Sequence, residues 1–144
     1  MTAKLLATVA CTVLLTSIAL AQDGHLELKL TSAPSLRILS APEKLDREKR
    51  RVTLILEIEN SGDKTIKGFG WLYKTQDVIR DYNVSITANM PDVSVVLAPK
   101  ERKKVVVLQD AQVPEFILSM PDGEIEVVSV IFEDGSVWNR SNEK

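Results

Sequence analysis

Apolar and polar residues alternate along much of this chain, and the alternation is clearest in its middle. The segment Val52–Asn60 reads VTLILEIEN, with Val, Leu, Leu and Ile at every second position. Residues spaced by two lie on one face of a β-strand, so this segment predicts a strand with one face toward a core. Residues 25–31, HLELKLT, show the same period with three leucines and predict a half-buried strand near the N-terminus.

A second strand is predicted where aromatic residues recur at the same spacing. Phe69, Trp71 and Tyr73 share one face of the segment TIKGFGWLYK, and Gly68 and Gly70 alternate with them. Glycine within a strand is typical of a twist, a bulge or the close approach of another backbone.

The C-terminal segment EIEVVSVIFEDGSVW predicts a β-hairpin. Asp134-Gly135 separates two runs of β-branched and aromatic residues, and this dipeptide suits a type I′ turn that needs positive φ at both central residues. With these two residues as the loop, antiparallel register places Ile131 opposite Trp138.

Turn residues divide the rest of the chain into short segments. Pro34 and Pro42 flank SLRIL, which predicts an edge strand that breaks and resumes, because proline donates no ladder hydrogen bond. Residues 43–51 form a charged connection in which we expect at most one helical turn. Further short strands are predicted at residues 84–88, 93–97 and 103–108.

Strands at a spacing of about 8–12 residues are typical of an all-β sandwich or barrel. We therefore predict an immunoglobulin-like antiparallel β-sandwich of about seven to eight strands. Its expected core comprises Val52, Leu54, Leu56, Ile58, Phe69, Trp71, Val105, Val107, Val128, Val130 and Phe132.

The first 21 residues predict a cleaved secretory signal peptide, which leaves residues 22–144 as one domain. Lys4 precedes an uncharged apolar stretch, and Ala19-Leu20-Ala21 supplies the small residues that signal peptidases require. An uncleaved membrane anchor is the alternative, but the stretch is shorter than the ~20 residues that span a bilayer. Lipidation at Cys11 is a third reading, against which the residues before Cys11 argue. We expect no transmembrane anchor after cleavage.

Composition and charge favour an exported globular protein. Of the 144 residues 44% are hydrophobic and 26% charged, and removal of Lys4 leaves 17 basic residues against 20 acidic ones. This balance argues against nucleic acid as the main partner, because nucleic acid rewards a concentrated positive field. A processed chain without cysteine favours a periplasmic or secreted bacterial protein over a disulfide-rich eukaryotic one.

The order of the turn motifs resembles a family of exported bacterial domains. Asn60-Ser61-Gly62-Asp63-Lys64 follows an alternating strand, Trp71-Leu72-Tyr73 ends an aromatic strand, and Leu97-Ala98-Pro99-Lys100 precedes a valine-rich strand. In this respect residues 50–138 resemble the FxLYD and CARDB-type modules. Lys100 stands where those families often have glycine. The resemblance implies an immunoglobulin-like fold and an exported location, and it implies no catalytic residue.

Few residues offer catalytic or metal-binding chemistry. The processed chain contains one histidine, His25, and no cysteine, which excludes a histidine or cysteine zinc site. Cleavage after Gln22 would place His25 third in a free N-terminus suited to copper or nickel, whereas cleavage after Ala21 would not. Acidic pairs such as Glu57 with Glu59, and Glu124 with Glu126, fit a solvated strand face. No cofactor is expected.

The terminal hairpin is apolar on both faces, and we take one of them as a possible interaction face. That face comprises Ile125, Val127, Ile131 and Trp138, and the other carries Val128, Val130 and Phe132. The second face is covered either by the chain itself or by a partner, such as another envelope or secreted protein or a second copy. We therefore expect a non-enzymatic binding or structural module of the bacterial envelope that acts through a sheet face or loops. The alternative is a secreted hydrolase that uses carboxylates in a loop-lined site.

Overall fold

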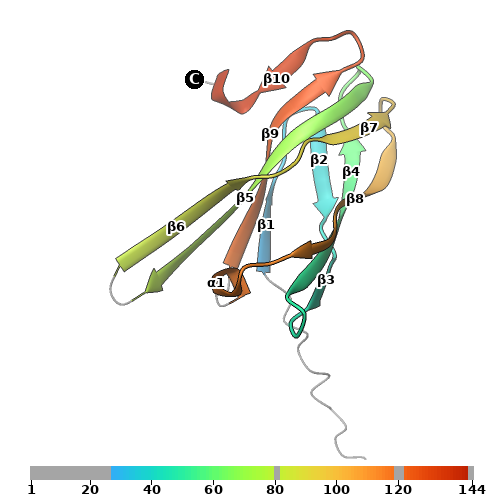
Figure 1. Ribbon diagram of the computed structural model, residues 1–144. Helices are drawn as coiled ribbons and strands as arrows, with labels where there is room; N and C mark the ends of the chain where they lie inside the picture. The colour runs from blue at the N-terminus through green and yellow to red at the C-terminus, as the bar shows by residue number, and fades with distance from the viewer. Residues whose placement is uncertain (1–26, 80–81, 119–121, 143–144) are drawn as a thin grey trace, which may run out of the picture.

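The chain folds as two β-sheets packed face to face (Figure 1). The computed structural model describes residues 27–79, 82–118 and 122–142, and the predicted signal peptide, Cys11 and His25 lie outside these residues. The six-stranded sheet contains β1 (Glu27–Thr31), β5 (Ile66–Ile79), β6 (Tyr82–Asn89), β7 (Val93–Leu97), β9 (Asp122–Phe132) and β10 (Val137–Asn139). The four-stranded sheet contains β2 (Leu36–Ser40), β3 (Glu43–Asp46), β4 (Arg51–Asn60) and β8 (Arg102–Gln112). Two short helical turns complete the elements, α1 (Glu115–Leu118) and η1 (Arg140–Asn142).

The strand pairing confirms the predicted all-β sandwich. β4 pairs antiparallel with β8 in one sheet, and β5 pairs antiparallel with β9 in the other. These are the central pairs that an immunoglobulin-like sandwich requires. The described residues form ten strands, more than predicted, because the edges are broken into pieces: β6 and β7 both pair with β5, and β1 and β10 both pair with β9.

β4 has the predicted inner face. Leu54, Leu56 and Ile58 are buried, as two-residue alternation requires. β2 and β3 pair antiparallel with the same side of β4, so the predicted broken edge strand is confirmed. The prediction for residues 43–51 is wrong in part, because residues 43–46 pair with β4 as a strand and only the following four residues form a turn.

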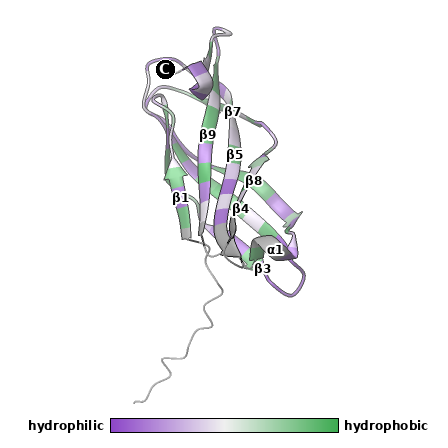
Figure 2. Cartoon of the chain, turned by 90° about the vertical axis from the view of Figure 1, so that its left-hand side faces the viewer, coloured by the Kyte–Doolittle hydropathy of each residue, from purple (hydrophilic) through white to green (hydrophobic). Residues whose placement is uncertain are grey.

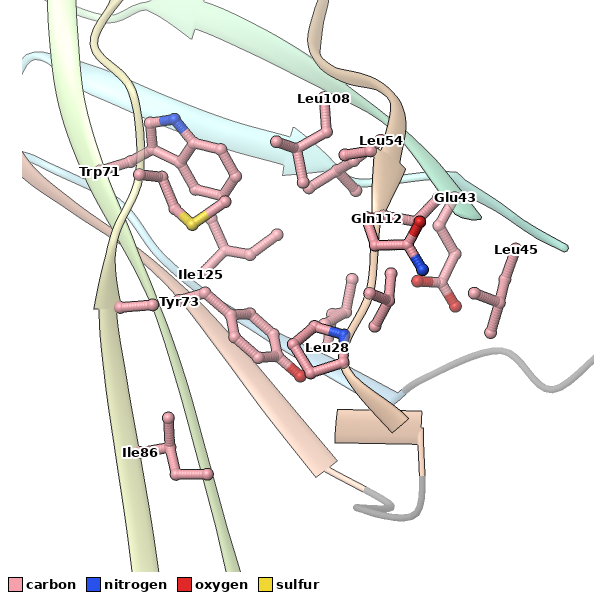
Figure 3. Close-up of a pocket in the computed structure, with 16 residues that line it drawn as sticks. Leu28, Glu43, Leu45, Leu54, Trp71, Tyr73, Ile86, Leu108, Gln112 and Ile125 are labelled. Carbon is pink, nitrogen blue, oxygen red and sulfur yellow. The ribbon is translucent and has the colours of Figure 1, made fainter. Parts of the chain in front are cut away.

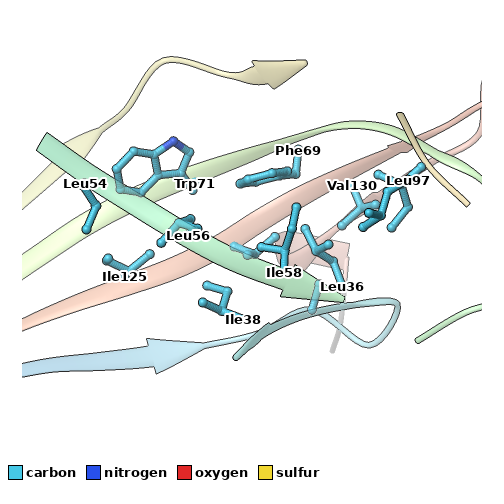
Figure 4. Close-up of a cluster of buried hydrophobic side chains, with 13 residues drawn as sticks. Leu36, Ile38, Leu54, Leu56, Ile58, Phe69, Trp71, Leu97, Ile125 and Val130 are labelled. Carbon is cyan, nitrogen blue, oxygen red and sulfur yellow. The ribbon is translucent and has the colours of Figure 1, made fainter. Parts of the chain in front are cut away.

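The core lies between the sheets (Figure 4). Six of the predicted core residues are buried there: Leu54, Leu56, Ile58, Phe69, Trp71 and Val130. Three more are partly buried against it: Val105, Val107 and Phe132. Val52 and Val128 are only half-buried and lie outside the cluster. The core also takes in residues that the prediction missed: Leu36, Ile38, Ile66, Leu97, Ile125 and Val127.

Two bulges exchange the faces of β5 and β9, and they explain why Ile66, Ile125 and Val127 were missed as core residues. Lys67 is an extra residue of β5 between the pairs of Ile66 and Gly68, and Val128 is an extra residue of β9 opposite Gly70 and Trp71. A bulge of one residue reverses which side chains face the core beyond it. Hence both Val130 and Val127 point inward, and hydrophobic and hydrophilic bands follow one another along β9 (Figure 2).

Close approach of another backbone, one of the predicted roles of the strand glycines, is confirmed at Gly68. A Cβ atom at Gly68 would lie 2.7 Å from the carbonyl oxygen of Val93 in β7. β7 can therefore pair closely with β5 at this point only because Gly68 has no side chain.

The terminal hairpin exists, but its predicted register is wrong. Val137 pairs with Ile131, and Trp138 pairs with Val130. The amide of Gly135 donates to the carbonyl of Phe132 at 3.0 Å, and Gly135 has a φ of +82°. The loop therefore has three residues and ends in a glycine bulge, which shifts every pair by one position relative to a two-residue loop.

Candidate functional site

A cavity opens between the two sheets at the end of the sandwich where β3 and β8 lie (Figure 3). Its volume is about 250 Å³, and both sheets contribute to its wall. Leu54, Trp71 and Ile125 are buried deep in the wall, whereas Gln112 and Pro114 are exposed to solvent. The burial gradient indicates a pocket that runs from the surface into the edge of the core.

Small side chains and an irregular strand create the space. Ala88 of β6 and Ala111 of β8 both line the cavity and leave much of the gap between the sheets unfilled. Near Ala111, β8 is bulged against β4, with Asp110 at a φ of +48° and its amide donating to Thr53 Oγ1 at 3.1 Å. These irregularities change the direction of β8, so its end does not pack as a regular strand over β5 and β9.

The aromatic residues of β5 form the wall on the side of the six-stranded sheet. Trp71 Nε1 donates to the carbonyl oxygen of Pro91 at 3.1 Å, which fixes the plane of the indole. The Tyr73 ring packs against Gly123, where a Cβ atom would lie 2.6 Å from the phenol oxygen. Because Gly123 has no side chain, the Tyr73 ring can lie against β9.

The wall carries little polarity. Tyr73 Oη is fully buried, and within the described part of the chain no group satisfies hydrogen-bond geometry with it, although the Thr75 side chain lies close enough to affect its titration. Burial raises the pKa of the Tyr73 phenol most, the neighbouring Thr75 hydroxyl lowers it by less, and the charge of Glu43 adds a still smaller rise. Tyr73 is therefore neutral at physiological pH. Glu43 and Gln112 add polar atoms to a lining that is otherwise mainly hydrocarbon.

The predicted interaction face does not exist as one surface. Ile125 and Val127 are fully buried and face the opposite sheet. Trp138 packs against the same core, since it pairs with Val130. Of the four residues only Ile131 is exposed, with 37% of its surface accessible. The bulge at Val128 and the three-residue hairpin loop cause this difference, because each changes which side chains share a face.

The acidic pairs are engaged in ion pairs and hydrogen bonds on the outer sheet faces. Glu59 contacts Arg37 and Arg102, and Glu126 contacts Lys74 and Arg140. Glu124 accepts a hydrogen bond from Thr31, which lowers the pKa of its carboxyl despite partial desolvation. A lowered pKa is opposite to what a general acid requires at neutral pH.

In residues 27–79, 82–118 and 122–142, no group of three or more histidine, cysteine or acidic side chains is arranged to hold a metal ion. Across the same ranges no helix has the length and apolarity needed to cross a bilayer. The basic segments 47–51 and 100–104 lie at opposite ends of the four-stranded sheet, since Arg51 pairs with Gln112 and Glu59 pairs with Arg102 along antiparallel strands.

Fold and cavity together define a two-sheet β-sandwich with an apolar pocket between its sheets. Comparison with known proteins adds no relative, because no family model, no curated protein and no solved structure matches the chain.

The sequence contained only a weak signal of the pocket. Ala88 could be read as a small residue within a predicted strand, and Tyr73 as an inward aromatic. The contribution of Ala111 depends on the bulges of β8, which no alternation of residues revealed.

Proposed function

We propose that this chain is an exported, non-enzymatic binding module of the bacterial envelope or secreted fraction, and that the inter-sheet cavity is its ligand site. The observation that carries the proposal is an apolar cavity of about 250 Å³ at the edge of the hydrophobic core. An empty cavity costs stability because the lining atoms lose packing partners on one side. A ligand in the cavity would restore those contacts.

The lining defines the class of ligand. An apolar cavity of about 150 Å³ accommodates benzene, so this larger one suits a fused ring or an alkyl segment of about eight carbon atoms. Polar groups gather near Glu43 and the exposed Gln112, where the polar end of an amphipathic ligand would meet water. The proposed ligand is therefore a small amphipathic molecule with one apolar part that enters between the sheets.

A homologous series of ligands tests the proposal. The processed chain is titrated with straight-chain 1-alkanols from butanol to dodecanol by isothermal calorimetry. Each added methylene should strengthen binding about four-fold while it still enters the cavity. The gain should end at about eight carbon atoms, when the space is full. Binding that does not saturate would indicate adsorption on the surface and would refute the proposal. So would an affinity that keeps rising with chain length up to dodecanol.

Cavity-filling variants locate the binding. Ala111→Leu and Ala88→Leu place additional carbon atoms in the cavity. Each should weaken octanol binding at least ten-fold while the protein stays folded in thermal unfolding. The matched control is Ala98→Leu, because Ala98 is exposed and does not line the cavity. Octanol binding that survives both filling variants would place the site elsewhere.

A further inference from the structure

The edge of the six-stranded sheet at β6 lacks the features that keep strand edges from pairing. β6 spans Tyr82–Asn89, YNVSITAN, and contains no charged residue and no proline. Among the described strands it pairs only with β5, so one side of its backbone has no ladder partner. Such an edge can accept another strand.

The edges at β3, β8 and β1 are protected by charge, whereas the short edge strands β7 and β10 are uncharged like β6. β3 reads EKLD, with three charged residues in four. β8 begins with Arg102, Lys103 and Lys104 and carries a bulge near Asp110. β1 contains Glu27 and Lys29. Charged side chains and bulges are common devices against unwanted strand pairing, and β6 has neither.

β6 also belongs to an arm that has too little support of its own. The pairing of β5 with β9 ends at Thr75 and Gly123, and beyond that point β5 pairs only with β6 as far as Ile79 and Tyr82. Figure 1 shows this hairpin extending away from the rest of the sheet. A two-stranded hairpin alone is marginally stable in water, and further strands stabilise it.

We propose that β6 pairs antiparallel with β6 of a second copy, so that two arms form one four-stranded sheet. A twofold axis brings a strand against itself, and an uncharged strand meets no like charge in that arrangement. If β8 paired with β8 of a second copy, its basic residues Arg102, Lys103 and Lys104 would lie either beside the same residues of the other copy or beside Asp110, where a bulge interrupts the strand. This inference is independent of the ligand site and goes beyond the proposed binding function.

Charge variants on β6 test the pairing. Ser85 and Thr87 are exposed on β6, and neither lines the cavity. The processed chain is studied by sedimentation velocity over a wide concentration range as wild type, as Ser85→Lys/Thr87→Lys and as Ser85→Glu/Thr87→Glu. Wild type should show a concentration-dependent monomer–dimer equilibrium, and each variant should weaken dimerisation at least ten-fold. An equimolar mixture of the Lys and Glu variants should restore dimers.

The control Ala98→Lys/Gln109→Lys adds the same charge at exposed positions outside β6 and should dimerise like wild type. Concentration-dependent protection of the β6 amides from hydrogen exchange gives a second readout in the wild-type chain alone. A chain that stays monomeric at all concentrations would overturn the proposal, and so would a Lys variant that dimerises normally. The proposal would also be overturned if the β6 amides were protected from hydrogen exchange only when a different protein is added.

Discussion

At the scale of single residues, Arg140 closes a gap along the edge of β9. β1 pairs with β9 up to Glu126, and β10 pairs with it only from Ser129 onward. Between them the Arg140 side chain donates to the carbonyl of Val127 at 3.0 Å and to that of Ser32 at 2.8 Å. Its Nε also lies 2.8 Å from Glu126, a buried carboxylate. One side chain thus substitutes for the missing strand.

Arg140→Gln should therefore destabilise the fold strongly. Removal of the guanidinium leaves Glu126 with Lys74 as its remaining cation and leaves two carbonyls without their donor. We expect a loss of about 3 kcal/mol in the free energy of unfolding, as for other buried ion pairs that lose one partner. Urea denaturation measures it.

The matched control is Arg102→Gln, which breaks an exposed pair with Glu59. It should cost no more than about 1 kcal/mol. Equal losses for the two variants would show that Arg140 is only a surface cation.

The hairpin loop adds a pH dependence through Asp134. Lys64 lowers the pKa of the Asp134 carboxyl most, and the Ser136 hydroxyl and amide lower it further. A carboxyl with a lowered folded-state pKa stabilises the fold fully above its unfolded value of 3.8, and this contribution is lost as the pH falls toward the folded value. As the pH is lowered below about 4, the melting temperature of the wild-type protein should fall. In Asp134→Asn this fall should be smaller, because asparagine cannot titrate. An unchanged slope would contradict this role.

At the scale of the elements, the three-residue loop of the terminal hairpin requires Gly135. Its φ of +82° lies in the left-handed region, and a Cβ atom there would meet nothing within 4 Å. Gly135→Ala should then cost about 1 kcal/mol through backbone strain alone. Gly135→Asn should cost less, because asparagine tolerates this conformation better. Thermal unfolding of both variants checks the order, and an alanine variant as stable as wild type would contradict it.

Sequence patterns predicted strands well wherever the ladder is regular. β4 met the expectation on its inner face because no bulge interrupts the positions of Leu54, Leu56 and Ile58 in that strand. In β9 the strand was predicted but its faces were wrong, because Val128 adds a residue and reverses the alternation. Asp-Gly suits both a two-residue and a three-residue loop, so the dipeptide alone did not determine the register.

At the scale of the whole molecule, the proposed ligand site depends on how the two sheets meet. The cavity results from the packing of both sheets, with Ala111 brought to it by bulges in β8 and Tyr73 held aside by Gly123. No local pattern encodes such a gap, because its walls lie far apart in the sequence. The alternation of apolar and polar residues predicted an all-β sandwich. The candidate site could be found only from the three-dimensional arrangement of the two sheets.

The most direct test is a crystal structure of residues 22–144 grown with 8-bromo-1-octanol, with the bromine located by its anomalous scattering. We predict one bromine peak between Leu54, Trp71 and Ile125, with the hydroxyl end toward Gln112. The Ala111→Leu variant should lack this peak under the same conditions. Bromine confined to the outer surface, or a cavity closed by its own side chains in the wild-type crystal, would contradict the ligand site.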